Sequence, residues 1–344
     1  MHLTLGILRT SQAVFYALAF FWLDGFAVPA PAQVTQTVRR FRSKQTMNSS
    51  FHPFRSAEAK AEYYDLYMKR VEKWSVASET RLIDTPSGQT FVRVSGSVTA
   101  PPLILLPGSK GTSLTWIPNI TNLSAHYRTY ALDSIYDFGL SVSHRNIKKP
   151  NDLITWLHEV LTVIAPDGLV NLLGLSYGGW LASRYALRFP HRINKVVLLD
   201  PAATILPVSF GLIFRALLSV IPLPSLRQQF YYWLLRDTMQ SGEIGKAYVD
   251  EAVADWTVAE RCFAPMPMVA ATVLDDQSLS DFPVPCLVLI GENEKVYSAR
   301  KAIQRLNRIA PQIKTYIIQN AGHDAWVVKA DIVTRKVLEF LSDS

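Results

Sequence analysis

The chain has 344 residues, 49% of them hydrophobic and 18% charged, which supplies enough apolar material for a buried core and predicts a globular protein. Its net charge is +7, but residues 1–46 contribute +4 and no basic run follows, so the charge argues against a nucleic-acid-binding face. The two cysteines, Cys262 and Cys286, are too few and too poorly spaced for a zinc site or a disulfide framework.

Residues 1–46 are predicted to be a leader. Residues 13–23 form an unbroken apolar run, and Ala-Pro-Ala at 30–32 follows it, as in a signal peptide. The run is about half as long as a membrane-spanning helix, and the basic cluster at 39–44 comes after it, where positive charge opposes export. Met47 would also serve as an ordinary start. Three interpretations of this segment therefore stay open: a signal peptide, a weak membrane anchor and an over-extended start. The location of the protein, cytoplasmic or else exported or membrane-tethered, stays open with them.

Residues 57–73 have the spacing of an amphipathic helix, which predicts an N-terminal helix region at 47–79. The β-branched and aliphatic runs that follow predict about eight strands, at 81–84, 90–94, 103–106, 129–132, 170–173, 196–199, 287–290 and 315–318. The first two flank a Pro-Ser-Gly turn and predict an antiparallel hairpin. Most later runs alternate with helical stretches, which is typical of a mostly parallel sheet flanked by helices on both faces.

The alternation breaks at about 202–281, where the spacing is helical and no strand is evident. This predicts a helical cap inserted into a single α/β domain at 80–344. Aromatic and aliphatic residues at 210–218 and 230–234 would line an apolar acyl site or, as their helical spacing favours, form the cap's own core.

The pentapeptide at 174–178, Gly-Leu-Ser-Tyr-Gly, carries the strongest chemical signal. By composition alone such a motif arises about once in ten chains of this length. Its context makes the motif a stronger indication of a catalytic serine, because the pentapeptide directly follows the strand at 170–173 and precedes a helical pattern at 179–188. A strained strand-to-helix turn lifts a serine oxygen clear of the sheet. Ser176 is therefore the predicted nucleophile, and the alternative is a glycine-rich turn with an incidental serine.

A serine nucleophile needs a base, which a third group orients, and in strand–turn–helix sites of this kind the chain order is serine, acid, histidine. His323 follows the strand at 315–318 after a short loop. Of the other six histidines, five precede Ser176 and His191 directly follows a helical pattern. His323 is therefore the predicted general base.

The acid is expected at the carboxyl end of a strand, because ligands of open α/β sheets gather outside those ends. Asp200, Glu292 and Glu294 meet this condition. Glu294 is preferred, since the second acidic position after the strand reaches toward the histidine loop, and Glu292 is interpreted as anchoring its own loop. Asp200 stays open as the alternative acid, its other role being a helix N-cap beside Pro201. The carboxylate would fix the histidine tautomer and stabilise the imidazolium.

A tetrahedral oxyanion needs two preorganised donors, usually backbone N–H groups. The N–H of Tyr177, directly after the nucleophile, is expected to be one. The other is expected from the tight loop at 107–111, where Ser109 is the preferred donor and a plain turn is the alternative.

The segments LLPGSKG, GLSYGGW, GENEKVY and AGH, in this order and spacing, resemble an α/β-hydrolase throughout residues 80–344. WIPNITNLSAHYRTYALD, the glutamate at 294 and a helix beginning at FRSAEA are similar to bacterial carboxylesterases of the naproxen-esterase type. The resemblance implies Ser176, Glu294 and His323 as a catalytic triad and a helical cap over an acyl pocket. One position departs from it, because Pro107 stands where such enzymes usually carry histidine.

The predicted function is the cleavage of carboxylic esters through an acyl-enzyme, acting on a small, apolar acyl substrate. Acyl transfer and the cleavage of lactones or carbon–carbon bonds reuse the same residues and stay open, as does a non-catalytic ligand-binding protein on the same fold. The sequence has no phosphate-cradling glycine loop, metal-ligand cluster or dinucleotide fingerprint, so neither a cofactor nor a metal is expected. The oligomeric state is left open.

Overall fold

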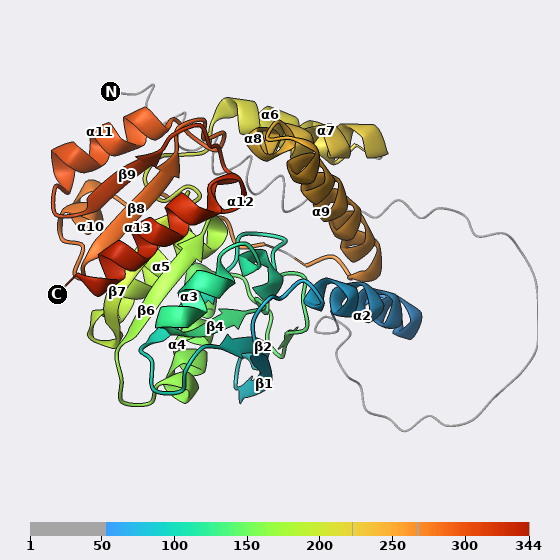
Figure 1. The fold of residues 1–344 in the computed structure, drawn as a ribbon, viewed down its shortest axis with the longest axis horizontal. Helices are drawn as coiled ribbons and strands as arrows, with labels where there is room; N and C mark the ends of the chain where they lie inside the picture. Colours follow the sequence, from blue (N-terminus) through green and yellow to red (C-terminus); the bar gives the residue numbers. More distant parts are fainter. Residues whose placement is uncertain (1–52, 222, 267, 344) are drawn as a thin grey trace, which may run out of the picture.

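The computed structural model describes residues 53–221, 223–266 and 268–343. The predicted leader at 1–46 lies outside these ranges, as do the first residues of the helix region at 47–79. Figure 1 shows one twisted sheet with helices packed against it and a further group of helices beyond one of its ends.

The described residues form a nine-stranded sheet in the order β1-β2-β4-β3-β6-β7-β8-β9, with β5 paired to β2. The strands are β1 (Ser78–Thr85), β2 (Gly88–Ser95), β3 (Pro102–Leu106), β4 (Arg128–Leu132), β5 (Val142–Ser143), β6 (Val170–Leu175), β7 (Ile193–Leu199), β8 (Cys286–Gly291) and β9 (Lys314–Ile318). β2 pairs antiparallel with β1, β4 and β5, and the pairs from β4 to β9 are parallel. The predicted mostly parallel sheet of about eight strands is confirmed, and β5 is too short to leave a periodic pattern.

Helices cover both faces of the sheet. One hydrophobic layer joins the sheet to α4 (Pro150–Ile164), α5 (Tyr177–Arg188), α10 (Asp276–Ser280) and α11 (Ala299–Ile309). The other joins it to α3 (Ile120–His126), α12 (Ala325–Val328) and α13 (Ala330–Ser342). β6 and β8 are buried along their whole length, because helices cover them on both sides. Strands of this kind appear in a sequence as continuous apolar runs.

The helices called the cap below lie between β7 and β8: α6 (Phe210–Ser219), α7 (Pro224–Leu234), α8 (Arg236–Met239) and α9 (Glu243–Cys262). Figure 1 shows α6, α7 and α8 grouped together and α9 running from them toward α2 (Ala57–Val71). Of the helices that the structure describes, none has both the length and the apolar character needed to cross a bilayer.

α2 lies against α9 and so joins the start of the described chain to the cap. Arg70 of α2 donates two hydrogen bonds, of 2.6 and 2.8 Å, to the carboxylate of Asp255 in α9. The hydroxyl of Tyr67 lies 2.9 Å from that of Ser113, in the segment after β3. α2 therefore contacts both the cap and the loop region at the carboxyl end of the sheet.

The contact between the loop after β3 and the first turn of α5 requires a glycine. A Cβ atom added at Gly178 would lie 2.5 Å from the carbonyl oxygens of both Leu106 and Pro107. Those oxygens belong to the backbone and cannot turn aside as a flexible side chain would. The start of α5 is therefore packed directly on this loop.

Gly178→Ala is expected to lower the free energy of unfolding by about 1–3 kcal/mol, because the added methyl group forces the helix and the loop apart. Gly168→Ala is the matched control, since its Cβ would meet only the Cβ of Ala165 at 3.7 Å, an ordinary contact. Urea unfolding followed by circular dichroism measures both variants. Equal stabilities would contradict the close packing described for Gly178.

Candidate active site

Ser176 occupies the sharp turn between β6 and α5. Its backbone has φ 51° and ψ −113°, a strained conformation for a residue with a side chain. The N–H of Ser176 donates to the carbonyl of Leu199 at 2.8 Å, and its own carbonyl accepts from Trp180 and Ala202 at 3.0 Å each. These bonds to β7, α5 and the loop after β7 hold the turn from three sides and fix the direction of the side chain.

His323 lies between Ser176 and Glu294 in a chain of hydrogen bonds. Its Nε2 is 3.0 Å from the Oγ of Ser176, and its Nδ1 is 2.9 Å from the Oε2 of Glu294. Glu294 follows β8 and His323 follows β9, and all three side chains are buried. An ionised Glu294 accepts a hydrogen bond from the N–H at Nδ1, which leaves Nε2 as the acceptor for the hydroxyl of Ser176.

The environment of this pair favours its charged forms. Burial would raise the pKa of Glu294, but the charge and hydrogen bond of His323, together with hydrogen bonds from Asp200 and from the N–H of Val296, lower that pKa. Burial would lower the pKa of His323, but the charge of Glu294 and its hydrogen bond raise it, and the charge of Asp324 adds to the effect. Glu294 therefore stays ionised and stabilises a protonated His323.

Asp200 lies behind Glu294 at the end of β7. One of its oxygens accepts the N–H of Gly291 at 2.8 Å, and its side chain is fully buried. Burial raises the pKa of Asp200 well above its usual range, and the negative charge of Glu294 beside it raises the pKa further. These effects favour the protonated form of Asp200, whose second oxygen has no donor partner among the described contacts and, when protonated, can donate a hydrogen bond to Glu294. The carboxylate hydrogen-bonded to His323 is that of Glu294.

The loop after β3 lies next to Ser176. A Cβ added at Gly108 would be 3.2 Å from the Cβ of Ser176, and the loop turns tightly, with the N–H of Gly111 bonded to the carbonyl of Gly108 at 3.0 Å. Within the described residues, neither the N–H of Ser109 nor that of Tyr177 donates to another protein group. Tyr177 begins α5, where the first N–H groups of a helix lack internal partners and carry partial positive charge. Both residues predicted to supply donors thus line the same cavity as Ser176.

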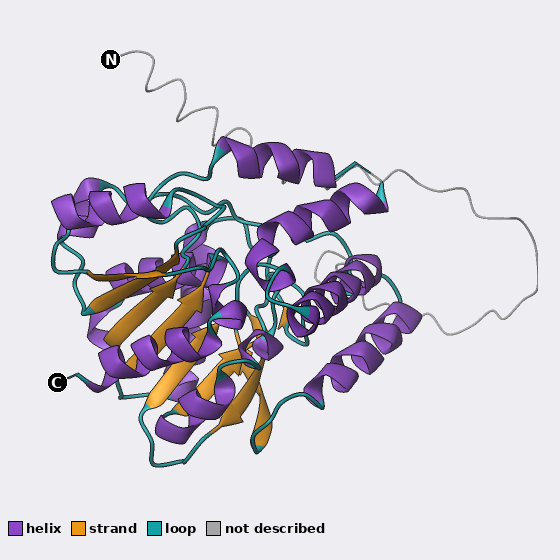
Figure 2. Cartoon of the chain, turned by 45° about the horizontal axis from the view of Figure 1, so that its top comes forward, coloured by secondary structure: helices purple, strands orange, loops and turns teal. Residues whose placement is uncertain are grey.

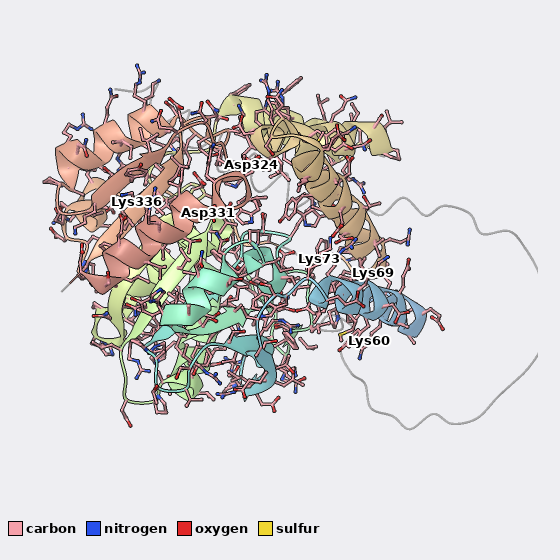
Figure 3. The ribbon with its side chains drawn as sticks, in the orientation of Figure 1. Lys60, Lys69, Lys73, Asp324, Asp331 and Lys336 are labelled. Carbon is pink, nitrogen blue, oxygen red and sulfur yellow. The ribbon has the colours of Figure 1, made fainter. Side chains whose placement is uncertain are left out.

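Two residues that the sequence analysis did not single out connect these loops to the cap. The ammonium group of Lys110 donates to Glu260 of α9 and to the hydroxyl of Tyr231 of α7, each at 2.5 Å. The carboxylate of Asp324 accepts the N–H of Thr238 of α8 at 2.7 Å and lies where α12 approaches α8 (Figure 3). Both residues stand beside a predicted site residue in the sequence, but no local pattern identifies partners that are 150 and 86 positions away.

Glu292, interpreted from the sequence as an anchor for its own loop, binds the neighbouring loop instead. Its carboxylate accepts the N–H of Asn320 at 3.1 Å, between β9 and the histidine. Asn320 has φ 54°, a left-handed conformation that asparagine tolerates better than most residues. Glu292 therefore stabilises the loop that carries His323 and makes no hydrogen bond to His323 itself among the described contacts.

Ser176 and His323 open into a cavity of 360 Å³ between the sheet and the cap. Its polar lining residues include Ser109, Lys110, Ser176, Glu260 and His323, whereas most of the wall is apolar. The apolar lining comes from Leu175, Val208, Leu212, Ile213, Ala216, Phe230, Tyr231, Leu234, Met268, Val296 and Trp326. The cavity therefore suits a ligand with a small polar centre and an apolar body.

Comparison with known proteins gives consistent results. The family described as the alpha/beta hydrolase family matches residues 103–334. The chain is 31% identical to an uncharacterized carboxylesterase, nap, of Bacillus subtilis (strain 168) over 282 residues, 81% of this chain and 92% of that protein. It is 28% identical to carboxylesterase YbfK of the same strain over 288 residues, 84% and 96% of the two proteins. The crystal structure of naproxen esterase (carboxylesterase NP) from Bacillus subtilis has a TM-score of 0.74 at 30% identity, covering 83% of this chain and 99% of that one.

These matches confirm the predicted resemblance to α/β-hydrolases and, among them, to carboxylesterases of the naproxen-esterase type. The matched residues begin in β3 and end in α13, so they include Ser176, Glu294 and His323 together with the strands that precede them. By the extent of this similarity, the chain belongs to the alpha/beta hydrolase family.

Proposed function

We propose that the protein hydrolyses carboxylic esters through an acyl-enzyme, with Ser176 as nucleophile, His323 as general base and Glu294 as the orienting acid. The observation that carries the proposal is the continuous pair of hydrogen bonds centred on His323, 3.0 Å to the oxygen of Ser176 and 2.9 Å to that of Glu294. The carboxylesterase names of relatives that span most of the chain support the same reaction class.

In the first half of the reaction, the oxygen of Ser176 attacks the ester carbonyl carbon while its proton passes to Nε2 of His323. The N–H groups of Ser109 and Tyr177 stabilise the resulting oxyanion. When the intermediate collapses, the ester C–O bond breaks and the proton on Nε2 passes to the departing alcohol. The acyl group is then bound to Ser176 through an ester.

In the second half, His323 takes a proton from water, and the water oxygen attacks the acyl-enzyme carbonyl. The second tetrahedral intermediate collapses, the proton returns to the oxygen of Ser176, and the carboxylic acid leaves. Glu294 remains ionised throughout and balances the positive charge that His323 gains in each half-reaction.

The substrate is proposed to be a small ester with an apolar acyl group. The cavity volume of 360 Å³ lies near the lower end of the range of about 300–1,000 Å³ found for ligand pockets. Aliphatic and aromatic side chains of α6 and α7 cover the side of the cavity that faces the cap. Such a wall favours an acyl chain or ring over a charged substituent, which would lose its hydration there.

Ser176→Ala is expected to lower kcat/KM for a p-nitrophenyl ester on the order of 10⁴-fold, because no other group can form the acyl-enzyme. Ser109→Ala is the matched control and should keep most of the activity, since the proposed donor is the backbone N–H. Release of p-nitrophenol gives the rates, and circular dichroism checks the fold. Full turnover by purified, folded Ser176→Ala protein would rule out Ser176 as the nucleophile.

Activity should decrease as the pH falls through the pKa of His323, because only the neutral ring accepts the proton of Ser176. Glu294 raises this pKa above its ordinary value of about 6.5, so the acidic midpoint of kcat/KM is expected above that value. In Glu294→Gln the burial remains and the attraction is lost, so the midpoint should move to lower pH. A midpoint that stays in place in Glu294→Gln would contradict the assignment of Glu294.

The two neighbouring carboxyl groups should respond differently to amide substitution. Asp200→Asn keeps a neutral donor toward Glu294 and an acceptor for the N–H of Gly291, so kcat/KM should fall by no more than about tenfold, the value of one hydrogen bond. Glu294→Gln should lower kcat by about 10³–10⁴-fold, because the charge opposite His323 is lost. Steady-state kinetics compares the two, and a larger loss in Asp200→Asn would make Asp200 the charged acid.

A further inference from the structure

α6 is apolar on two faces. One face lines the cavity above Ser176 with Leu212, Ile213 and Ala216. The other carries large apolar side chains that face solvent: Phe210 is 85% exposed, Phe214 55%, Leu217 36% and, just beyond the helix, Ile221 41%. A helix with apolar residues on more than one face is normally buried against other apolar groups on each of those faces, whereas the outer face of α6 is exposed.

The exposed residues form one stripe. Phe210, Phe214, Leu217 and Ile221 are spaced by four, three and four positions, so they lie on one line along α6 and its extension. Leu223, 53% exposed, follows this apolar surface beyond its far end, whereas Val220 belongs to the face that lines the cavity. Figure 2 shows α6 as the uppermost helix of the cap, with its outer side turned away from the sheet.

The charges along the segment that carries the stripe have one sign. Between residues 202 and 236 the chain has no aspartate or glutamate and three arginines, Arg215, Arg227 and Arg236. Arg227 pairs with Glu260 of α9 at 2.5 Å. Arg215 and Arg236 are exposed, and the guanidinium of Arg215 lies 4.5 Å from the centre of the Trp233 ring of α7. The nearest acidic residues along the chain, Asp237 and Glu243, belong to α8 and to the start of α9.

We propose that the outer face of α6 docks on an anionic lipid surface, with the stripe of Phe210, Phe214, Leu217 and Ile221 inserted among the acyl chains. An apolar helical face on a segment that has arginines and no acidic residue is the composition of helices that lie in a membrane interface. The docking is parallel to the surface, because α6 is far too short to span a bilayer. This site is separate from the predicted leader and does not depend on the proposed esterase reaction.

A second copy of the chain fits the same face less well. In a twofold symmetric contact the same surface is present on both sides, so two such stripes would face each other with segments that carry only positive charge. The segment from 202 to 236 supplies no acidic side chain to neutralise that charge. A surface of anionic lipid headgroups supplies that negative charge at every position around the stripe.

The test is flotation of the full-length chain with vesicles of equal parts phosphatidylglycerol and phosphatidylcholine, and with phosphatidylcholine alone. The wild-type chain should bind the anionic vesicles more strongly. Phe210→Ser/Phe214→Ser should lower the partition coefficient about tenfold or more, since two inserted aromatic rings are lost. Val163→Ser/Leu169→Ser is the matched control, because these residues are 55% and 52% exposed but lie in α4 and the loop after it. It should bind as the wild type does.

Equal binding by the wild-type chain and Phe210→Ser/Phe214→Ser would overturn the proposal and assign any vesicle binding to another part of the chain, such as residues 1–52. Failure of the wild-type chain to bind either vesicle would overturn it as well. Light scattering after size-exclusion chromatography gives the remaining outcome. A wild-type dimer that Phe210→Ser/Phe214→Ser converts to a monomer would assign the face to a second copy and overturn the lipid assignment. Unfolding curves that coincide for all variants exclude loss of the fold as the cause.

Discussion

The parallel pairing of β6, β7, β8 and β9 is the constraint on which the candidate active site depends. Parallel strands have their carboxyl ends at the same edge of a sheet, so residues far apart in sequence meet there. Ser176 and His323 are 147 positions apart, yet their side chains are joined by a hydrogen bond. The backbone bonds of Ser176 to Leu199, of Asp200 to Leu289 and of Glu292 to Ile318 connect consecutive strand ends across this edge. Each loop therefore starts from a position that the neighbouring strand fixes.

The electrostatics at this edge favour one negative charge shared between the neighbouring side chains of Glu294 and Asp200. Two buried carboxylates in contact repel each other, and both lose their hydration, so one of them takes up a proton. Glu294 has the imidazole and the N–H of Val296 as partners, whereas Asp200 has only the N–H of Gly291. This difference in partners favours the protonated form at Asp200. In the proposed mechanism this neutral acid fixes Glu294 without adding a charge that would make His323 a stronger base.

The cap is attached to the site through polar contacts rather than through its apolar faces alone. Lys110, next to the proposed oxyanion donor Ser109, is bonded to α7 and α9, and Asp324, next to His323, is bonded to α8. A displacement of these helices would therefore act on both loops around Ser176. α6 is attached at its start, where the N-cap residue Ser209 donates its backbone N–H to the carbonyl of Val296 at 2.6 Å and its hydroxyl to that of Lys295 at 2.9 Å. The two apolar faces of α6 lie toward the cavity and toward solvent.

Much of the fold and part of the site follow from the sequence because they depend on local patterns. Strands that are covered on both sides need continuous apolar runs, so these runs located the strands in the sequence. The strained turn at Ser176 needs glycine at 174 and 178, because an added Cβ there would lie within 2.6 Å of backbone atoms. His323 was identifiable because it alone follows a late strand. The two-residue β5, the bridge from Lys110 to Glu260 and the bond from Asp324 to Thr238 were not predictable, since their partners come from distant segments with no periodic signal.

The choice between Glu294 and Asp200 shows the same division most clearly. The sequence determined that acidic residues follow β7 and β8, because local apolar patterns identify both strands and the positions where they end. Only the tertiary structure decided which carboxylate contacts His323 and which one is left behind it with a proton. Protonation depends on burial and on the distance between charges, and neither quantity exists until the strands are aligned in the sheet. The exposure of the outer face of α6 was likewise determined only by the tertiary structure. The sequence pattern of its apolar residues fits a buried helix equally well.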